Sequence, residues 1–149
     1  MMFLRKAFHN PIITKHMGAE AEWYASLIKP TWAPPEWLFG PAWTVLYVII
    51  AISFAYVGIR YWKGQIGFMV LLPFILNLVF NLAFTPIQFG LRNNWLAAID
   101  IILVWVTLVW ALAAIRSHIP WVAYANLPYF LWVSFASVLQ ISITWLNRL

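Results

Sequence analysis

The sequence predicts an all-α membrane protein, folded as an antiparallel bundle of four transmembrane helices. Composition is the first observation: 64% of the 149 residues are hydrophobic and only 9% are charged, whereas a soluble domain carries about a quarter charged residues. The second observation is that four long apolar stretches are joined by short connections. Short connections place consecutive helices side by side in opposite directions, so a multi-pass integral membrane protein is expected.

Each apolar stretch is long enough to cross the hydrocarbon core, which takes about 20 residues. The four spans are predicted at residues 41–59, 67–91, 95–115 and 120–146. Asp100 is the one acidic or basic side chain within them. Basic residues in the connections, where they meet anionic headgroups, explain the net charge of +5. No nucleic-acid partner is therefore expected.

Residues 1–22 are predicted to be a polar N-terminal arm, and residues 23–149 the transmembrane domain. Charged side chains interrupt every apolar run in the arm, so it resembles neither a fifth span nor a signal peptide. Basic residues near the span ends balance on the two sides, which leaves the orientation open. Counting the basic residues of the arm favours a cytoplasmic N-terminus.

Several classes of site are excluded by the residue types. His9, His16 and His118 all lie outside the predicted spans, which excludes a haem held by two histidines inside the bundle. Without cysteine, and with only four carboxylates, the chain offers too few ligands for a transition-metal cluster. No catalytic residue, metal site or covalently bound cofactor is predicted.

Polar side chains recur at membrane depth. The second span carries one helical stripe of Asn77, Asn81, Phe84 and Gln88. Hydrogen bonds between helices are the expected role of Asn77 and of Gln140 on the last span, whereas Asn81 stays open between packing and ligand binding. Asp100 is a functional candidate because it is ionisable within a span, although an acid satisfied by a neighbouring donor is the favoured interpretation.

Tryptophan is concentrated in residues 23–43, WYASLIKPTWAPPEWLFGPAW, which contain four tryptophans and four prolines. The prolines prevent a continuous helix and predict a stiff aromatic loop at the mouth of the first span. Trp43 and Trp132 lie just inside their spans and are expected to face each other across the bundle. Two such indoles predict a flat apolar slot for a rigid polycyclic ligand.

This stretch and the following TVLY resemble the signature of the translocator protein family, also called tryptophan-rich sensory proteins or peripheral-type benzodiazepine receptors. The signature is Trp-Tyr, then Lys-Pro-x-Trp-x-Pro-Pro, then a Trp that opens a span, followed by Leu-Tyr. The resemblance continues through LNLVFNLAFTPIQFG, WLAAIDIILV and LPYFLWVSFASVLQISITWLN, and so covers the chain from Trp23 onwards.

The resemblance implies a helical bundle in a bacterial inner membrane or a mitochondrial membrane. By this resemblance, the bundle is expected to bind a tetrapyrrole such as protoporphyrin IX, or a sterol-like molecule as in some members, and to contact membrane lipid. The residues carried over are Trp23 and Tyr24 at the lip of the pocket, Pro34 in the loop, and Trp43, Asn81, Trp132 and Ala136 inside. The tryptophan-rich loop then corresponds to a lid over the pocket.

Two features depart from the family pattern. Members usually have five spans, and the one before the Trp-Tyr motif is missing here, so a second copy of the chain or a helix from a larger complex is expected to cover that side. The C-terminal sterol-recognition pattern requires a tyrosine, whereas VLQISITWLNR has Trp145, so sterol binding is not expected there.

Three functions remain open. The first is a non-enzymatic tetrapyrrole-binding protein that acts as a sensor, carrier or scavenger. The second is an accessory structural subunit of a larger membrane complex that retains the family fold. The third is an enzyme that degrades porphyrin in light. Retention of Trp43, Asn81 and Trp132 favours the first, and no acid–base machinery supports the third.

Overall fold

The structure is a computed structural model that describes residues 23–148, so the predicted polar arm, residues 1–22, lies outside the described residues. Within the described part all regular structure is helical. The four long helices are α3 (Phe39–Trp62), α4 (Phe68–Thr85), α5 (Asn94–Ile115) and α7 (Leu127–Leu146). Shorter elements are η1 (Glu36–Leu38), the π-helical η2 (Pro86–Gly90) and α6 (Pro120–Ala125). The predicted all-α bundle is confirmed.

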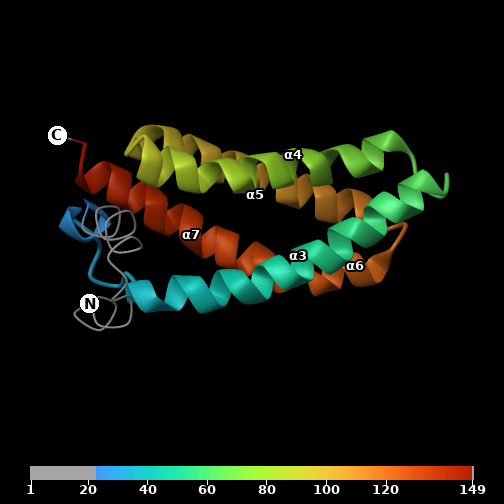
Figure 1. Ribbon diagram of the computed structural model, residues 1–149, viewed down its shortest axis with the longest axis horizontal. Helices are drawn as coiled ribbons and strands as arrows, with labels where there is room; N and C mark the ends of the chain where they lie inside the picture. Colours follow the sequence, from blue (N-terminus) through green and yellow to red (C-terminus); the bar gives the residue numbers. More distant parts are fainter. Residues whose placement is uncertain (1–22, 149) are drawn as a thin grey trace, which may run out of the picture.

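The long helices alternate in direction along the bundle (Figure 1). Helix α5 packs against both α4 and α7. Helix α3 meets α4 near their connection and diverges from it towards the tryptophan-rich end, where α7 ends as well (Figure 1). Four segments are long and apolar enough to cross a membrane: Glu36–Trp62, Phe68–Gly90, Asn94–Ile115 and Leu127–Leu146.

The fourth predicted span, 120–146, is not one continuous helix, which corrects the expectation from hydropathy. It divides at Asn126 into α6 and α7. Pro128 has no backbone N–H and disfavours a helical residue before it. The Asn126 Nδ2 donates to the Val122 carbonyl at 2.8 Å and to Ser53 Oγ on α3 at 3.0 Å. The break is therefore held against the first span.

The turn between the second and third spans positions two polar side chains. Helix α4 widens into η2 at Pro86, which buries Gln88. Arg92 then adopts a left-handed conformation with φ of 51°, and the Asn93 side chain accepts a hydrogen bond from the Leu96 N–H at 3.0 Å. This N-cap starts α5 and leaves Asn94 facing the ends of η2 and α7.

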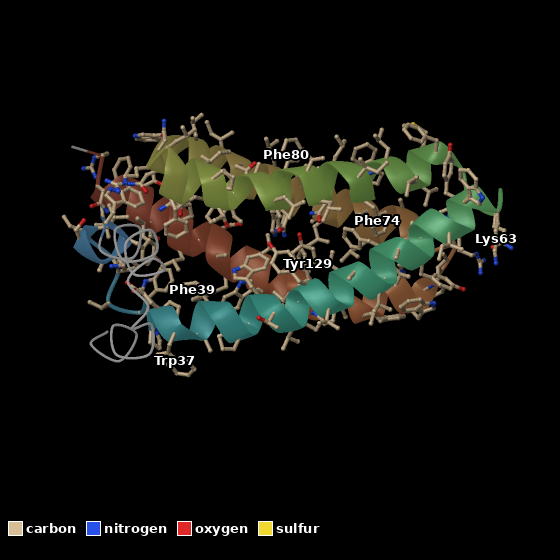
Figure 2. All side chains as sticks on the ribbon, in the orientation of Figure 1. Trp37, Phe39, Lys63, Phe74, Phe80 and Tyr129 are labelled. Carbon is tan, nitrogen blue, oxygen red and sulfur yellow. The ribbon has the colours of Figure 1, made fainter. Side chains whose placement is uncertain are left out.

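The core consists of two groups of buried side chains. One fills the end where α3 turns into α4 and includes Val57, Phe74 and Ile115. The other fills the middle of the bundle; its members include Leu46, Ile101, Val104, Tyr129 and Val133. Figure 2 shows Tyr129 directed into the bundle, with Phe39 nearer the tryptophan-rich end and Lys63 at the opposite end. The second group, which we call the central cluster, supports the predicted site.

Candidate functional site

Trp43 and Trp132 are in contact, as their positions on α3 and α7 predict. Their ring centroids are 6.5 Å apart and their planes are at 90°, so the indoles meet edge to face. Trp43 also packs on Tyr47 at 5.5 Å and on Tyr129 at 6.4 Å. The expected slot between two facing indoles is therefore wrong in one respect: perpendicular rings in contact leave no parallel gap between them.

Ala136 lies one helical turn after Trp132 and packs, partly buried, against the central cluster. Trp43 and Trp132 pack against the same cluster. The structure thus brings three of the predicted pocket residues together.

Aromatic contacts connect the loop to this site. Tyr24 packs edge to face on Phe39 at 6.5 Å, and Phe39 packs edge to face on Trp132 at 5.8 Å. Trp23 contacts Phe89 of η2 at 6.5 Å, and Tyr24 contacts the same ring at 5.8 Å. Tyr24 is thus joined to the two indoles through Phe39, whereas Trp23 packs over η2.

Tyr24 also has a polar environment. The Lys29 Nζ lies 4.8 Å from the centroid of its ring, within the range of a cation–π interaction. Burial, and secondarily the Glu36 carboxylate, raises the pKa of the Tyr24 phenol to about 12. The phenol therefore stays protonated at neutral pH and keeps a hydrogen-bond donor at the lip of the site.

A shallow, open depression of about 400 Å³ lies between the loop and the start of α7. Its lining is almost entirely apolar and consists of Pro34, Leu38, Pro128, Leu131, Trp132 and Phe135. Its volume falls in the range of small-molecule sites. Pro34 and Trp132 thus line the same depression, and Trp132 also packs against the central cluster.

Asn81 belongs to a chain of hydrogen bonds that joins four helices, α3, α4, α5 and α7. The Tyr47 hydroxyl donates to Asn81 Oδ1 at 2.8 Å, and Asn81 Nδ2 donates to the Tyr129 hydroxyl at 2.6 Å. Tyr129 donates to Asn77 Oδ1 at 2.9 Å, and Asn77 Nδ2 donates to the Val104 carbonyl at 2.9 Å. The helix-bridging role expected for Asn77 is confirmed. Asn81 has the same kind of partners, and its role towards a ligand stays a prediction.

Gln140 also bridges helices, as expected: its Nε2 donates to the Asn94 carbonyl at 3.3 Å. Asp100 differs from its expectation. It is 5% exposed, and its Oδ2 is buried with no hydrogen-bond partner among the described residues. The neighbouring donor that the favoured interpretation expects is thus not found among residues 23–148. The indole Nε1 of Trp132 is also buried and has no hydrogen-bond partner among residues 23–148.

Sequence reasoning missed the attachment of the loop to the last helix. The Ile28 N–H donates to Asn147 Oδ1 at 2.9 Å, and Asn147 Nδ2 donates to the Ile28 carbonyl at 2.8 Å. These bonds join positions that are 119 residues apart in the sequence, so no local sequence pattern indicates the pairing. Among residues 23–148 no group of three or more His, Cys, Asp or Glu side chains is placed to hold a metal ion.

The fold and the site together define the class of this protein. It is a small membrane helix bundle whose proline- and tryptophan-rich loop is joined by aromatic contacts to two indoles. The model of the TspO/MBR family matches residues 3–146 of this chain. The chain belongs to the TspO/MBR family. It is a multi-pass integral membrane protein, with four helices able to span a membrane among its described residues. The family match also includes most of the stretch predicted as an N-terminal arm.

Relatives of similar sequence come from distant organisms. The tryptophan-rich protein TspO of Chlorobaculum tepidum is 36% identical over 129 residues, which cover 85% of this chain and 81% of the relative. The tryptophan-rich sensory protein of Cereibacter sphaeroides is 30% identical over 137 residues, covering 92% and 84%. The human translocator protein is 34% identical over 128 residues, covering 83% and 73%.

Proposed function

We propose that this protein binds a tetrapyrrole of the protoporphyrin type, or a similar polycyclic apolar ligand, beneath the tryptophan-rich loop, and acts as a sensor, carrier or scavenger. The observation that carries the proposal is the edge-to-face contact of Trp43 with Trp132, reached from the loop through Tyr24 and Phe39. Aromatic rings on two helices and on the loop supply stacking and edge contacts for a flat ring system.

The state of Trp132 favours its displacement by a ligand. A buried donor without a hydrogen-bond partner lowers the stability of the fold by about 1–3 kcal/mol relative to a bonded donor. The Trp132 Nε1 is such a donor among the described residues. A ligand that carries a carbonyl or carboxylate group can accept this N–H. The indole then exchanges its contact with Trp43 for contact with the ligand face, and a hydrogen bond is gained.

The relatives' names fit a role in responding to or carrying a small molecule, since one is called a sensory protein and another a translocator protein. An accessory structural subunit remains the second candidate. Large apolar side chains on α3, Val45, Val48 and Ile52 among them, are more than half exposed, and either lipid or another chain can cover them.

Titration of the purified protein with protoporphyrin IX, followed by tryptophan fluorescence, tests the proposal. Wild-type protein should bind with quenching, and Trp132→Ala should weaken binding by about 2–4 kcal/mol because an aromatic anchor is lost. Trp62→Ala is the matched control, because Trp62 is 88% exposed at the opposite end of α3. Unchanged affinity in the Trp43→Ala, Trp132→Ala double variant would overturn the proposed site.

A further inference from the structure

Asp100 is an acid buried in a membrane-spanning helix with no hydrogen-bond donor at its Oδ2 among the described residues. Only 5% of its surface is exposed. An unpaired carboxylate in an apolar medium is unfavourable by several kcal/mol. Ionisable residues at membrane depth therefore usually have a functional partner. The helix contacts indicate where such a partner would lie.

Two hydrogen bonds fix the register of α4 and η2 against α5. Gln88 Nε2 donates to Asn94 Oδ1 at 3.2 Å at one end, and Asn77 Nδ2 donates to the Val104 carbonyl at 2.9 Å further along. Asp100 lies between Asn94 and Val104. Because the two helices are antiparallel, Asp100 is level with the residues around Asn81.

Two more hydrogen bonds fix the register of α5 against α7. Gln140 Nε2 donates to the Asn94 carbonyl at 3.3 Å, and Trp105 Nε1 donates to Ser134 Oγ at 2.9 Å. Asp100 lies between Asn94 and Trp105, which places it level with the part of α7 between Ser134 and Gln140. Ala136 lies in that part, one helical turn from Trp132.

The face of α5 that carries Asp100 is turned into the bundle. Val104 and Thr107 share this face at helical spacing; both are buried, and both contact Asn77 of α4. Ile101, the next residue, belongs to the cluster against which Trp43 and Trp132 pack. The buried carboxylate therefore faces the bundle interior next to the central cluster, on which the two indoles also pack.

We propose that Asp100 is the hydrogen-bond acceptor and counter-ion of this site, and that the site selects flat polycyclic ligands carrying a cationic or N–H nitrogen. The inference rests on the ligand site proposed above. The unpaired oxygen of Asp100 accepts the nitrogen's hydrogen, and the unpaired N–H of Trp132 donates to an acceptor elsewhere on the ligand. The Asp100 carboxylate and the Trp132 N–H thereby let an apolar site distinguish ligands of equal shape by their hydrogen-bonding groups and charge.

A pair of isosteric probes tests this selectivity. The 9-aminoacridine cation and neutral anthracene are both flat three-ring molecules, and only the first carries N–H donors and a positive charge. Each is titrated into lipid nanodiscs that contain wild-type protein, Asp100→Asn or Asp100→Leu, with tryptophan quenching as the readout. Each probe is compared across variants, so its partition into lipid cancels.

Wild-type protein should bind 9-aminoacridine about tenfold or more tightly than either variant does, as expected for loss of a charge-assisted hydrogen bond. Anthracene affinity should be unchanged within about twofold. Asp100→Glu should partly restore the preference, and Thr107→Val, on the same face, should leave it intact. Asp100→Asn is nearly isosteric, so it keeps the test valid if Asp100→Leu does not fold.

One outcome would overturn the role of Asp100 and leave the proposed site intact. In that outcome wild type and Asp100→Asn bind 9-aminoacridine equally, while Trp132→Ala weakens the binding of anthracene. Loss of thermal stability in Asp100→Asn with no change in probe preference would also overturn the role of Asp100, since the carboxylate would then be paired within the chain. If neither probe nor protoporphyrin IX bound in a Trp132-dependent way, both proposals would fail.

Discussion

Asn147, in the last turn of the chain, holds Ile28 of the tryptophan-rich loop by two hydrogen bonds, one to its N–H and one from the Asn147 amide to its carbonyl. A third bond, from the Asn147 Nδ2 to the Ile143 carbonyl at 2.8 Å, fixes the amide on α7. One side chain thus satisfies both backbone groups of Ile28. The loop is attached to the bundle by a polar clamp besides its aromatic contacts.

Asn147→Ala should loosen the loop. Loss of two hydrogen bonds at an exposed site lowers the local free energy of opening by about 1–2 kcal/mol, so hydrogen exchange around Ile28 should accelerate about tenfold. Porphyrin dissociation should accelerate in parallel. Arg148→Ala is the control, because Arg148 bonds only to the Trp145 carbonyl among the described residues. Unchanged exchange at Ile28 would show that the aromatic contacts alone hold the loop.

Asn77→Leu and Asn81→Leu should separate stability from binding. Asn77 bridges α4 to α5 and to Tyr129, so its loss should lower the melting temperature, with an unfavourable change of about 1–3 kcal/mol. Asn81→Leu should weaken porphyrin binding more than it lowers the melting temperature. Thermal unfolding and fluorescence titration measure the two effects. Equal melting shifts with no effect on binding would assign both residues to packing.

Free haem should bind no more tightly than metal-free protoporphyrin IX. His118, in the α5–α6 connection, is the one histidine among residues 23–148, so the ring has to be recognised through its faces and edges. Competition titration measures the relative affinities, and the absorption spectrum reports the coordination of the iron. A spectrum of six-coordinate, bis-histidine haem would contradict this expectation.

A second chain should pack against α3. Ala51 and Ala55 are both exposed, one turn apart, and such small pairs permit close approach of helices. The protein has no cysteine, so Ala51→Cys introduces a single crosslinking site. Oxidation in native membranes should then yield a disulfide-linked dimer. Val106→Cys on α5 is the control and should remain monomeric, because Val106 is exposed to a degree similar to Val48 of α3. A protein that stayed monomeric and bound porphyrin tightly would need no partner there.

Hydropathy predicted the four spans because apolar length is a property of each segment alone. The same measure could not locate the break at Asn126, where the composition stays apolar on both sides and the cause is Pro128 together with a bond to Ser53. The meeting of Trp43 and Trp132 was predicted from their positions just inside two spans. The angle between their rings was not predicted, because it depends on packing with Tyr129 and Phe39.

Other features of the site depend on several helices at once. The clamp at Ile28 needs a partner from the other end of the sequence. The missing partner of Asp100 becomes visible only when α4, α5 and α7 are in register. A sequence identifies such groups as polar residues at depth, but it cannot show whether they are satisfied.

The break at Asn126 also means that the last part of the chain consists of two helices, α6 and α7, with different partners. Helix α6 stays with α3 through the bond to Ser53, whereas α7 carries Trp132 in its first half and Asn147 just beyond its end. A small rotation of α7 about this hinge would move the indole and pull on the loop through Ile28 at the same time. Admission of a ligand and opening of its entrance would then be a single coupled motion, with Asn126 as the pivot.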